Sequence, residues 1–370
     1  MPGAQIAEGA SRSGDVPVAT GLTAVARART ARREHVLHAV PGAIVDAAPR
    51  WHPLGEEGPS YPMCSSRDAR EGRLACRGQL LTVAPGTYDW ICLLLAGQDR
   101  AGAHEILLHY EDAVDPEWLH AGSAGSAAGV RVARVGVPRP RPLVAVRLPE
   151  APGLRVLALT LVSPPHRPER AGSEPVAAPA GETGYRAVDL GAHLDCVGIE
   201  PTRRPGRAAF NVWSNAFPLE ELPCGSVVRI GDVPFRMPPA DGARPDNLRC
   251  RGQRIELPAG RADFLHVLAA AERRSEDPLT VHYADGTTRS HWLRVSDFWP
   301  ETPPRFGEAP ALRTSALLYP NHVDTRMSPA IWAERVPVAV PSGATAVTLP
   351  DNPAIHVLAM TVVAEDEGSR

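Results

Sequence analysis

The chain has 370 residues, 22% of them charged and 44% hydrophobic, with a formal net charge of −3 and a pI near 6.5. This length suits two domains of ordinary size, and the charge balance gives no reason to expect nucleic acid or an anionic membrane as a partner. All 39 basic residues are arginine, which excludes a Schiff-base lysine, a P-loop lysine and a kinase-type ATP-binding lysine.

The start of the chain carries no sign of export. The first 30 residues are rich in Ala, Gly, Ser and Arg, and no apolar run of roughly seven or more follows Arg32-Arg33, which argues against a secretion signal. No stretch approaches the ~18 apolar residues of a membrane-spanning helix. The six cysteines show no CxxC spacing, so reduced and mostly buried thiols are expected. We therefore expect a soluble cytoplasmic protein.

Short apolar runs between proline and glycine residues predict an all-β fold. The chain has 39 Pro and 32 Gly, which recur at turn-like intervals. Alternating apolar and polar residues favour a strand at 279–283, and a compact apolar run favours another at 355–363. Few helices are expected, with short ones at 23–38 and 217–222. The stretch 264–271 could be misread as helical because of its alanines.

Two halves of the chain repeat each other. The stretch 73–79 (Arg-Leu-Ala-Cys-Arg-Gly-Gln) returns at 247–253 as Asn-Leu-Arg-Cys-Arg-Gly-Gln, a shift of 174 residues (250 − 76). The match continues through His109-Tyr110 and His282-Tyr283, and it ends at Leu148 and Leu349 with a shift of 201 (350 − 149). A period this long indicates duplicated domains, because solenoid repeats have periods of roughly 20 to 50 residues.

The repeat sets the expected domain boundaries: a flexible N-terminal segment (1–34), a first sandwich (35–163), a Pro- and Ala-rich linker (164–184) and a second sandwich (185–365). The second copy has an extended opening segment and 27 extra residues (201 − 174) near 300–333. Duplicated scaffolds diversify in their loops, so a ligand site is expected beside this insertion and in the groove between the domains.

The second copy resembles the accessory β-sandwich module at the ends of bacterial glycoside hydrolases. The stretches that carry the likeness are Val188–His193, Gly225–Phe235, Pro245–Asn247 and Leu349–Thr361. The resemblance implies two tandem antiparallel β-sandwiches of the jelly-roll or galactose-binding-like type, and it implies no catalytic residue.

Two groups of histidines are candidates for acid–base chemistry. His109 and His282 lie on the strand face opposite the neighbouring tyrosine, where they either contact a ligand or are half-exposed structural residues. His322 and Asp324 are two positions apart in the insertion, a spacing found both in general bases oriented by an acid and in ordinary loops. No metal site is expected, because no metal-binding spacing stands in a supporting context.

Aromatic side chains of the second copy are candidates for stacking on a sugar ring. Trp213, Trp299 and Trp332 lie in the regions that only this copy has, and burial in the core is the alternative for each. The expected ligand-binding residues are Arg313, Trp299, Trp332, Asp297 and Tyr319.

We therefore predict a carbohydrate- or glycoside-binding tandem β-sandwich protein without its own glycosidase domain and without a cofactor. The expected ligand is a glycan or small molecule, with no nucleic acid or membrane partner, and a homo-oligomer is left open. The alternative is a small-molecule enzyme of bacterial specialised metabolism, an acid–base isomerase, cyclase or lyase, with its site in the interdomain groove. A structural partner of a larger enzyme is a third hypothesis.

Overall fold

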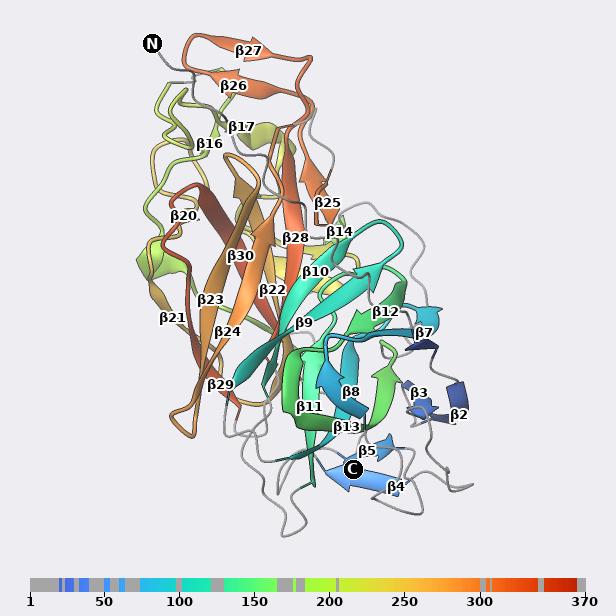
Figure 1. The fold of residues 1–370 in the computed structure, drawn as a ribbon. Helices are drawn as coiled ribbons and strands as arrows, with labels where there is room; N and C mark the ends of the chain where they lie inside the picture. Colours follow the sequence, from blue (N-terminus) through green and yellow to red (C-terminus); the bar gives the residue numbers. More distant parts are fainter. Residues whose placement is uncertain are drawn as a thin grey trace, which may run out of the picture.

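The computed structural model describes residues 20–21, 24–29, 33–39, 50–53, 60–63, 74–97, 102–120, 130–164, 176–177, 184–203, 206–299, 304–306, 308–338 and 343–364. Residues 1–19 and most of the expected linker lie outside these ranges. The described residues form two β-sandwiches arranged as neighbouring bodies (Figure 1).

Domain one is a sandwich of two sheets. One sheet has the strand order β1 (Thr20–Gly21), β7 (Leu80–Gly86), β12 (Leu143–Arg147), β9 (Ala103–Tyr110) and β10 (Val114–His120). The other has the order β11 (Val130–Gly136), β8 (Trp90–Gly97), β13 (Glu150–Val162), β3 (Glu34–Ala39) and β2 (Ala24–Arg29), with β6 (Leu74–Arg77) also paired to β13. A separate hairpin joins β4 (Arg50–Pro53) to β5 (Ser60–Met63).

Domain two repeats this pattern. Its larger sheet has the order β15 (Tyr185–Ala187), β30 (Ile355–Ala364), β22 (Ala262–Ala271), β28 (Ala330–Pro337) and β25 (Ala309–Arg313), with β20 (Leu248–Arg249) also paired to β30. Its smaller sheet has the order β21 (Arg254–Glu256), β29 (Ala344–Thr348), β23 (Ser275–Tyr283) and β24 (Thr288–Val295). The predicted all-β tandem sandwich is therefore confirmed.

The opening segment and the insertion, together with β14 (Val176–Ala177) of the expected linker, add a further layer to domain two. This layer holds β14, β16 (Ile199–Glu200), β17 (Phe217–Pro218), β18 (Val227–Ile230), β19 (Val233–Arg236), β26 (Leu317–Tyr319) and β27 (His322–Asp324), with 3-10 turns at Gly191–His193 and Leu219–Glu221. Its apolar side chains, including Phe210, Phe217 and Phe298, cover the outer face of the larger sheet. Domain two thus has a core on both faces of that sheet.

This double cover explains why the alanine-rich 264–271 is extended. In β22, Leu265, Val267 and Ala269 face the inner core, while Leu268 and Ala270 face the added layer. A strand whose two faces are both buried has no polar alternation to mark it. Small side chains on the outer face let the added layer approach closely.

The shared Cys-Arg-Gly-Gln stretch is a turn that both domains build alike. In domain two the Gln253 amide accepts from Arg251 N (2.7 Å) and donates to Arg249 O (2.6 Å). Gln79 makes the same two bonds in domain one, both at 2.7 Å. The glycine between them has φ +72° in each copy, a backbone conformation that side-chain-bearing residues rarely adopt. The repeated motif is therefore scaffold.

Both expected helices are corrected. The 23–38 region contains β2 and β3, which pair with each other and join the larger sheet of domain one. Strands of domain one thus begin before residue 35, within the segment expected to be flexible. The 217–222 region is a two-residue strand followed by the 3-10 turn Leu219–Glu221. Residues 217–222 are too few for a stable helix, and at 23–38 the pairing of β3 with the distant strand β13 decides the conformation.

Five of the six cysteines are free thiols, and Cys64 lies outside the described residues. Burial raises the pKa of the Cys76, Cys92, Cys196 and Cys224 thiols to about 12. In the part of the chain that the structure describes, no helix has the length and apolarity needed to cross a membrane.

Candidate functional site

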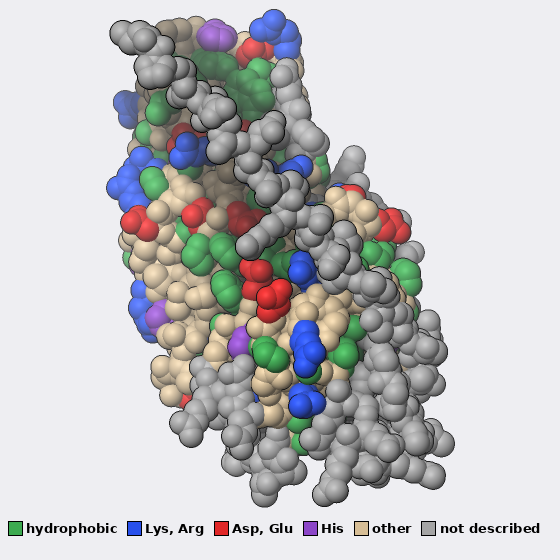
Figure 2. Space-filling model, in the orientation of Figure 1, with side chains coloured by type: hydrophobic (Ala, Val, Ile, Leu, Met, Phe, Trp, Pro, Cys, Tyr) green, Lys and Arg blue, Asp and Glu red, His purple; other side chains and the backbone are tan. Residues whose placement is uncertain are grey.

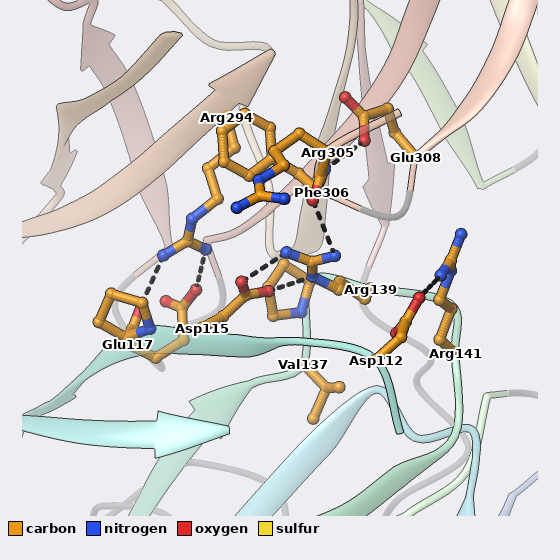
Figure 3. A network of polar contacts seen from close by, with 12 residues as sticks. Asp112, Asp115, Glu117, Val137, Arg139, Arg141, Arg294, Arg305, Phe306 and Glu308 are labelled. Carbon is orange, nitrogen blue, oxygen red and sulfur yellow. Dashed lines mark hydrogen bonds and ion pairs between the residues drawn. The ribbon is translucent and has the colours of Figure 1, made fainter. Parts of the chain in front are cut away.

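The insertion of domain two contributes to two separate places. Its first part, with Arg305, Phe306 and Glu308, lies beside domain one (Figure 3). Its later part forms the β26–β27 hairpin at the end of domain two that is remote from domain one (Figure 1). The interdomain groove and the insertion, which we expected to form one site, are therefore two regions.

A buried network of charges joins the domains (Figure 3). Arg294 of β24 reaches Glu117 of β10, with 2.5 Å between Nη1 and Oε1, and both side chains are about 95% buried. Next to them, Arg139 binds both carboxylate oxygens of Asp115, through Nε and through Nη2, the latter at 2.6 Å.

Carboxyl groups in this network are hard to ionise. Burial raises the pKa of Glu117 to about 7, although the neighbouring Arg294 opposes the rise. Burial also raises the pKa of Glu334 well above its ordinary value, and the nearby Glu308 carboxylate adds to this. The cause is the cost of removing a charge from water, which the arginines only partly offset.

The contacts between the domains follow an approximate two-fold symmetry. Trp118 and Trp292 occupy the same repeat position and stack, with ring centroids 6.1 Å apart. Trp90 and Phe264 are likewise equivalent, and their ring centroids are 4.8 Å apart. Each residue of such a pair faces its own counterpart, as residues do on the axis of a symmetric dimer.

Ion pairs obey the same symmetry. Arg335 of domain two binds Asp89 of domain one at 2.7 Å, and the equivalent Arg134 lies 3.7 Å from Asp263. Arg33 binds both aspartates, at 2.8 and 2.9 Å. All of these side chains are at least 85% buried. A network of this kind fixes the relative position of the two sandwiches.

The place related by symmetry to the Glu117–Arg294 ion pair holds two histidines instead. Glu117 and Arg294 correspond to His291 and His120 of the opposite copies, and these two imidazole rings lie 6.0 Å apart. Burial lowers the pKa of His120 to about 4 and that of His291 to about 3, so both rings are neutral at pH 7. The interface therefore combines one ion pair with one neutral histidine pair.

The histidines predicted as acid–base candidates lie elsewhere. His282 of β23 shares a hydrogen bond of 2.8 Å with the Thr348 hydroxyl, and His109 of β9 occupies the equivalent place near Arg147. Burial lowers the pKa of both rings. They lie on separate domains, and in the part of the chain that the structure describes neither is within ion-pair distance of a carboxylate. This arrangement gives no support to the enzyme hypothesis.

At the remote end of domain two, an asparagine network holds a turn that exposes apolar side chains. The Asn211 side-chain oxygen accepts from Trp213 N and Asn215 N, both at 3.1 Å, and the Asn211 amide donates to the Asn215 side chain at 2.9 Å. Ser214 adopts φ +54°. At the tip of this turn, Val212 and Trp213 are 83% and 63% exposed.

The β26–β27 hairpin lies directly beside this turn. Asn215 donates its amide to Leu318 O (3.2 Å), and Ala216 pairs with Leu318 through the backbone. On the hairpin, the rings of Tyr319 and His322 stack with centroids 4.5 Å apart and planes 8° from parallel. We call residues 200–203, 206–216 and 313–328 the distal end. Figure 2 shows a histidine and charged side chains there, next to apolar ones.

Asp324 does not orient His322. Its carboxylate binds the Arg326 guanidinium in two places, at 3.0 and 2.9 Å, and accepts from Arg326 N at 3.0 Å. These bonds lower the pKa of Asp324 to about 2. The predicted acid–base pair is therefore replaced by a stacked aromatic pair and a separate ion pair.

The other predicted ligand residues differ in how exposed they are. Trp332 is only 1% exposed and belongs to the inner core, where its indole N–H donates to Asp297 O at 3.1 Å. Trp299 is half-buried against the added layer. Arg313 is exposed, with its guanidinium 5.9 Å from the Trp332 ring. The structure thus corrects Trp332 as a sugar-stacking residue, because a buried ring offers no free face.

The comparisons with known proteins bear on domain two first. Residues 184–366 match the family model of the AziU2-like β-sandwich domain. This AziU2-like region covers the whole of domain two, and domain one repeats its strand order. The resemblance stated for the sequence is thus confirmed as a tandem β-sandwich.

Among solved structures, the chain matches one described as the N-terminal CBM22-1-CBM22-2 tandem domain from Paenibacillus barcinonensis Xyn10C. The two are 10% identical, the match covers 92% of this chain and 100% of that one, and the TM-score is 0.21. No curated protein matches the chain. A TM-score this low leaves the function to be judged from the residues of the distal end themselves.

Proposed function

We propose that this protein binds a carbohydrate or a glycosylated small molecule at the distal end of its AziU2-like domain. The observation that carries the proposal is Trp213, a large aromatic side chain that is 63% exposed on a turn locked by two asparagines. Of the three tryptophans that could stack on a sugar, it is the most exposed, because Trp332 is buried and Trp299 is half-buried.

A ligand that covers the exposed apolar side chains of this turn would gain free energy by burying them. Burying apolar surface stabilises by about 25 cal/mol per Å², and Val212 and Trp213 both forgo that burial. The Asn211 network fixes the backbone below them before any ligand arrives, which lowers the entropy lost on binding. An indole face suits the apolar face of a pyranose ring.

A neighbouring platform extends this surface. The Tyr319 and His322 rings form a nearly parallel pair on the hairpin, and the backbone pairing of Ala216 with Leu318 ties the hairpin to the Trp213 turn. Two aromatic elements on connected, hydrogen-bonded segments can contact more than one sugar unit. Ligands of this size bind where a few aromatic anchors are held rigid.

The test is binding of the full chain to a panel of glycans and glycosylated natural products, measured by isothermal titration calorimetry. Trp213→Ala should weaken binding at least about tenfold, because it removes both the stacking and its buried area. Val114→Ala is the matched control, since Val114 is 48% exposed on domain one. Equal affinities for the Trp213 and Val114 variants would reject the proposal.

A further inference from the structure

The carboxylates around the distal end are bound by groups of the protein itself. The Glu221 carboxylate binds Ser315, with 2.8 Å to its hydroxyl, and the Glu220 carboxylate binds Thr202 N and its hydroxyl at 2.9 to 3.2 Å. Asp324 is taken up by Arg326. The carboxylate oxygens here are therefore largely committed to groups of the protein itself.

The Glu200 carboxylate is likewise bound by groups of the protein, and through these bonds it positions the backbone of Arg207. It is only 1% exposed, and its carboxylate accepts from Gly206 N at 2.9 Å and from Arg207 N. Gly206 in turn lies against the hairpin, since a Cβ there would be 3.5 Å from Pro320 O. The backbone of Arg207 is thus held between a buried anchor and the tip of the β26–β27 hairpin.

Two arginines of the distal end have exposed side chains. Arg207 and Arg313 are exposed, and neither takes part in an ion pair in the described part of the chain, although the Arg313 guanidinium donates a hydrogen bond to Ser328 O at 3.1 Å. A guanidinium fork matches the two oxygens of a carboxylate or sulfate group. Arg207 lies on the same loop as Trp213, six residues before it, so a ligand long enough to span the loop would contact both an aromatic face and a cation.

We infer that the distal end selects acidic sugars, with Arg207 binding the anionic group of a uronate or sulfate ester while Trp213 stacks on the ring. This inference rests on the proposed function and adds the chemical class of its ligand. The exposed guanidinium of Arg207 supports it, because the carboxylates of Glu200, Glu220 and Glu221 are bound by groups of the protein itself.

The experiment compares three oligosaccharides of equal length, one neutral, one with uronate units and one with sulfate esters, titrated into the full chain. The acidic ligands should bind about tenfold more tightly than the neutral one, and added salt should reduce this advantage. The uronate and sulfate arms show which anion is preferred.

Arg207→Gln should remove the advantage of the acidic ligands and leave the neutral affinity unchanged. Arg207→Lys should restore part of it, because the charge returns without the fork. Arg254→Gln is the matched control, an exposed arginine of β21 paired with Glu256. Both arginine sites are on the surface, so the variants should fold, which their thermal melting checks.

Each outcome separates the inference from the proposed function. If Trp213→Ala weakens every ligand but Arg207→Gln has no effect, the glycan site stands and acidic selectivity is wrong. If Arg207→Gln matters and Trp213→Ala does not, the stacking proposal is wrong. Absence of binding to all three oligosaccharides overturns the inference, and absence of binding to the wider panel overturns the proposed function.

Discussion

Replacing Glu117 by glutamine should stabilise the protein in alkaline solution. Glu117 is 3% exposed at the junction of the two domains, and its pKa is raised from 4.5 to about 7. The folded protein therefore holds a proton that the unfolded chain releases between pH 4.5 and pH 7. The stability that Glu117 contributes is present below pH 4.5 and is lost as the pH rises through 7.

The size of this loss follows from the pKa values. One pKa unit equals about 1.4 kcal/mol, so the ionised Glu117 costs the folded state up to roughly 3 kcal/mol above pH 7. Glutamine resembles the protonated acid and carries no charge, and Arg294 keeps Glu276 as a partner at 3.2 Å. The variant should match the native protein at pH 4.5 and exceed its free energy of unfolding by up to ~3 kcal/mol at pH 8.

The assay is urea denaturation at several pH values, followed by tryptophan fluorescence and by far-UV circular dichroism. Arg294→Gln is the partner variant, because it leaves a buried carboxylate without its cation. It should destabilise by about 3 to 5 kcal/mol at pH 8 and by less at pH 5, where Glu117 takes up a proton. If Glu117→Gln destabilises equally at both pH values, the reasoning about this interface is refuted.

Three further predictions concern the same structure. Gly136→Ala should lower the free energy of unfolding by about 1 to 3 kcal/mol, because the new methyl group would lie 2.3 Å from Pro337 of domain two. The control is Gly153→Ala, whose methyl group would have no atom within 4 Å and which should be close to neutral in the same urea assay. The lowered pKa values of His120 and His291, about 4 and 3, predict that the stability they contribute above pH 6.5 is lost as the pH falls toward 4. His120→Phe should flatten that part of the pH profile, and an unchanged slope would contradict this. Trp332→Ala should cost about 3 to 5 kcal/mol, measured by the urea midpoint, because the ring is buried, and a neutral effect would place it outside the core.

The scaffold was largely predictable from the sequence, because its signals are local and occur twice. The Cys-Arg-Gly-Gln stretch forms the same side-chain-bridged turn in both domains, with Gln79 and Gln253 in equivalent roles. The prediction of a helix at 23–38 was wrong because the signal that decides this stretch is not local. Its residues become two strands because β13 offers a partner for β3, and a distant partner leaves no trace in local composition.

The interdomain contacts could not have been predicted from the repeat. Equivalence of Trp118 and Trp292 says that they occupy the same place in each sandwich, and it does not say that they touch. Likewise, nothing local to Arg33 shows that its guanidinium binds an aspartate from each domain. These contacts depend on how two finished surfaces fit together, which is a property of shape and charge over both domains.

The candidate site was predicted in part. The sequence pointed to the regions that only domain two has, and Tyr319 and Arg313 do lie at the distal end. Which tryptophan is exposed depends on the added layer. Trp332 faces the inner core, whereas the bonds of Asn211 hold Trp213 at the surface. A turn with two asparagines four residues apart is the signal that would have singled it out.

A crystal structure of the full chain with a bound acidic oligosaccharide tests the central claim most directly. We predict a sugar ring stacked on the indole face of Trp213, with its anionic group at the guanidinium of Arg207. A ligand bound instead in the groove between the domains, with the Trp213 turn unoccupied, would contradict the account.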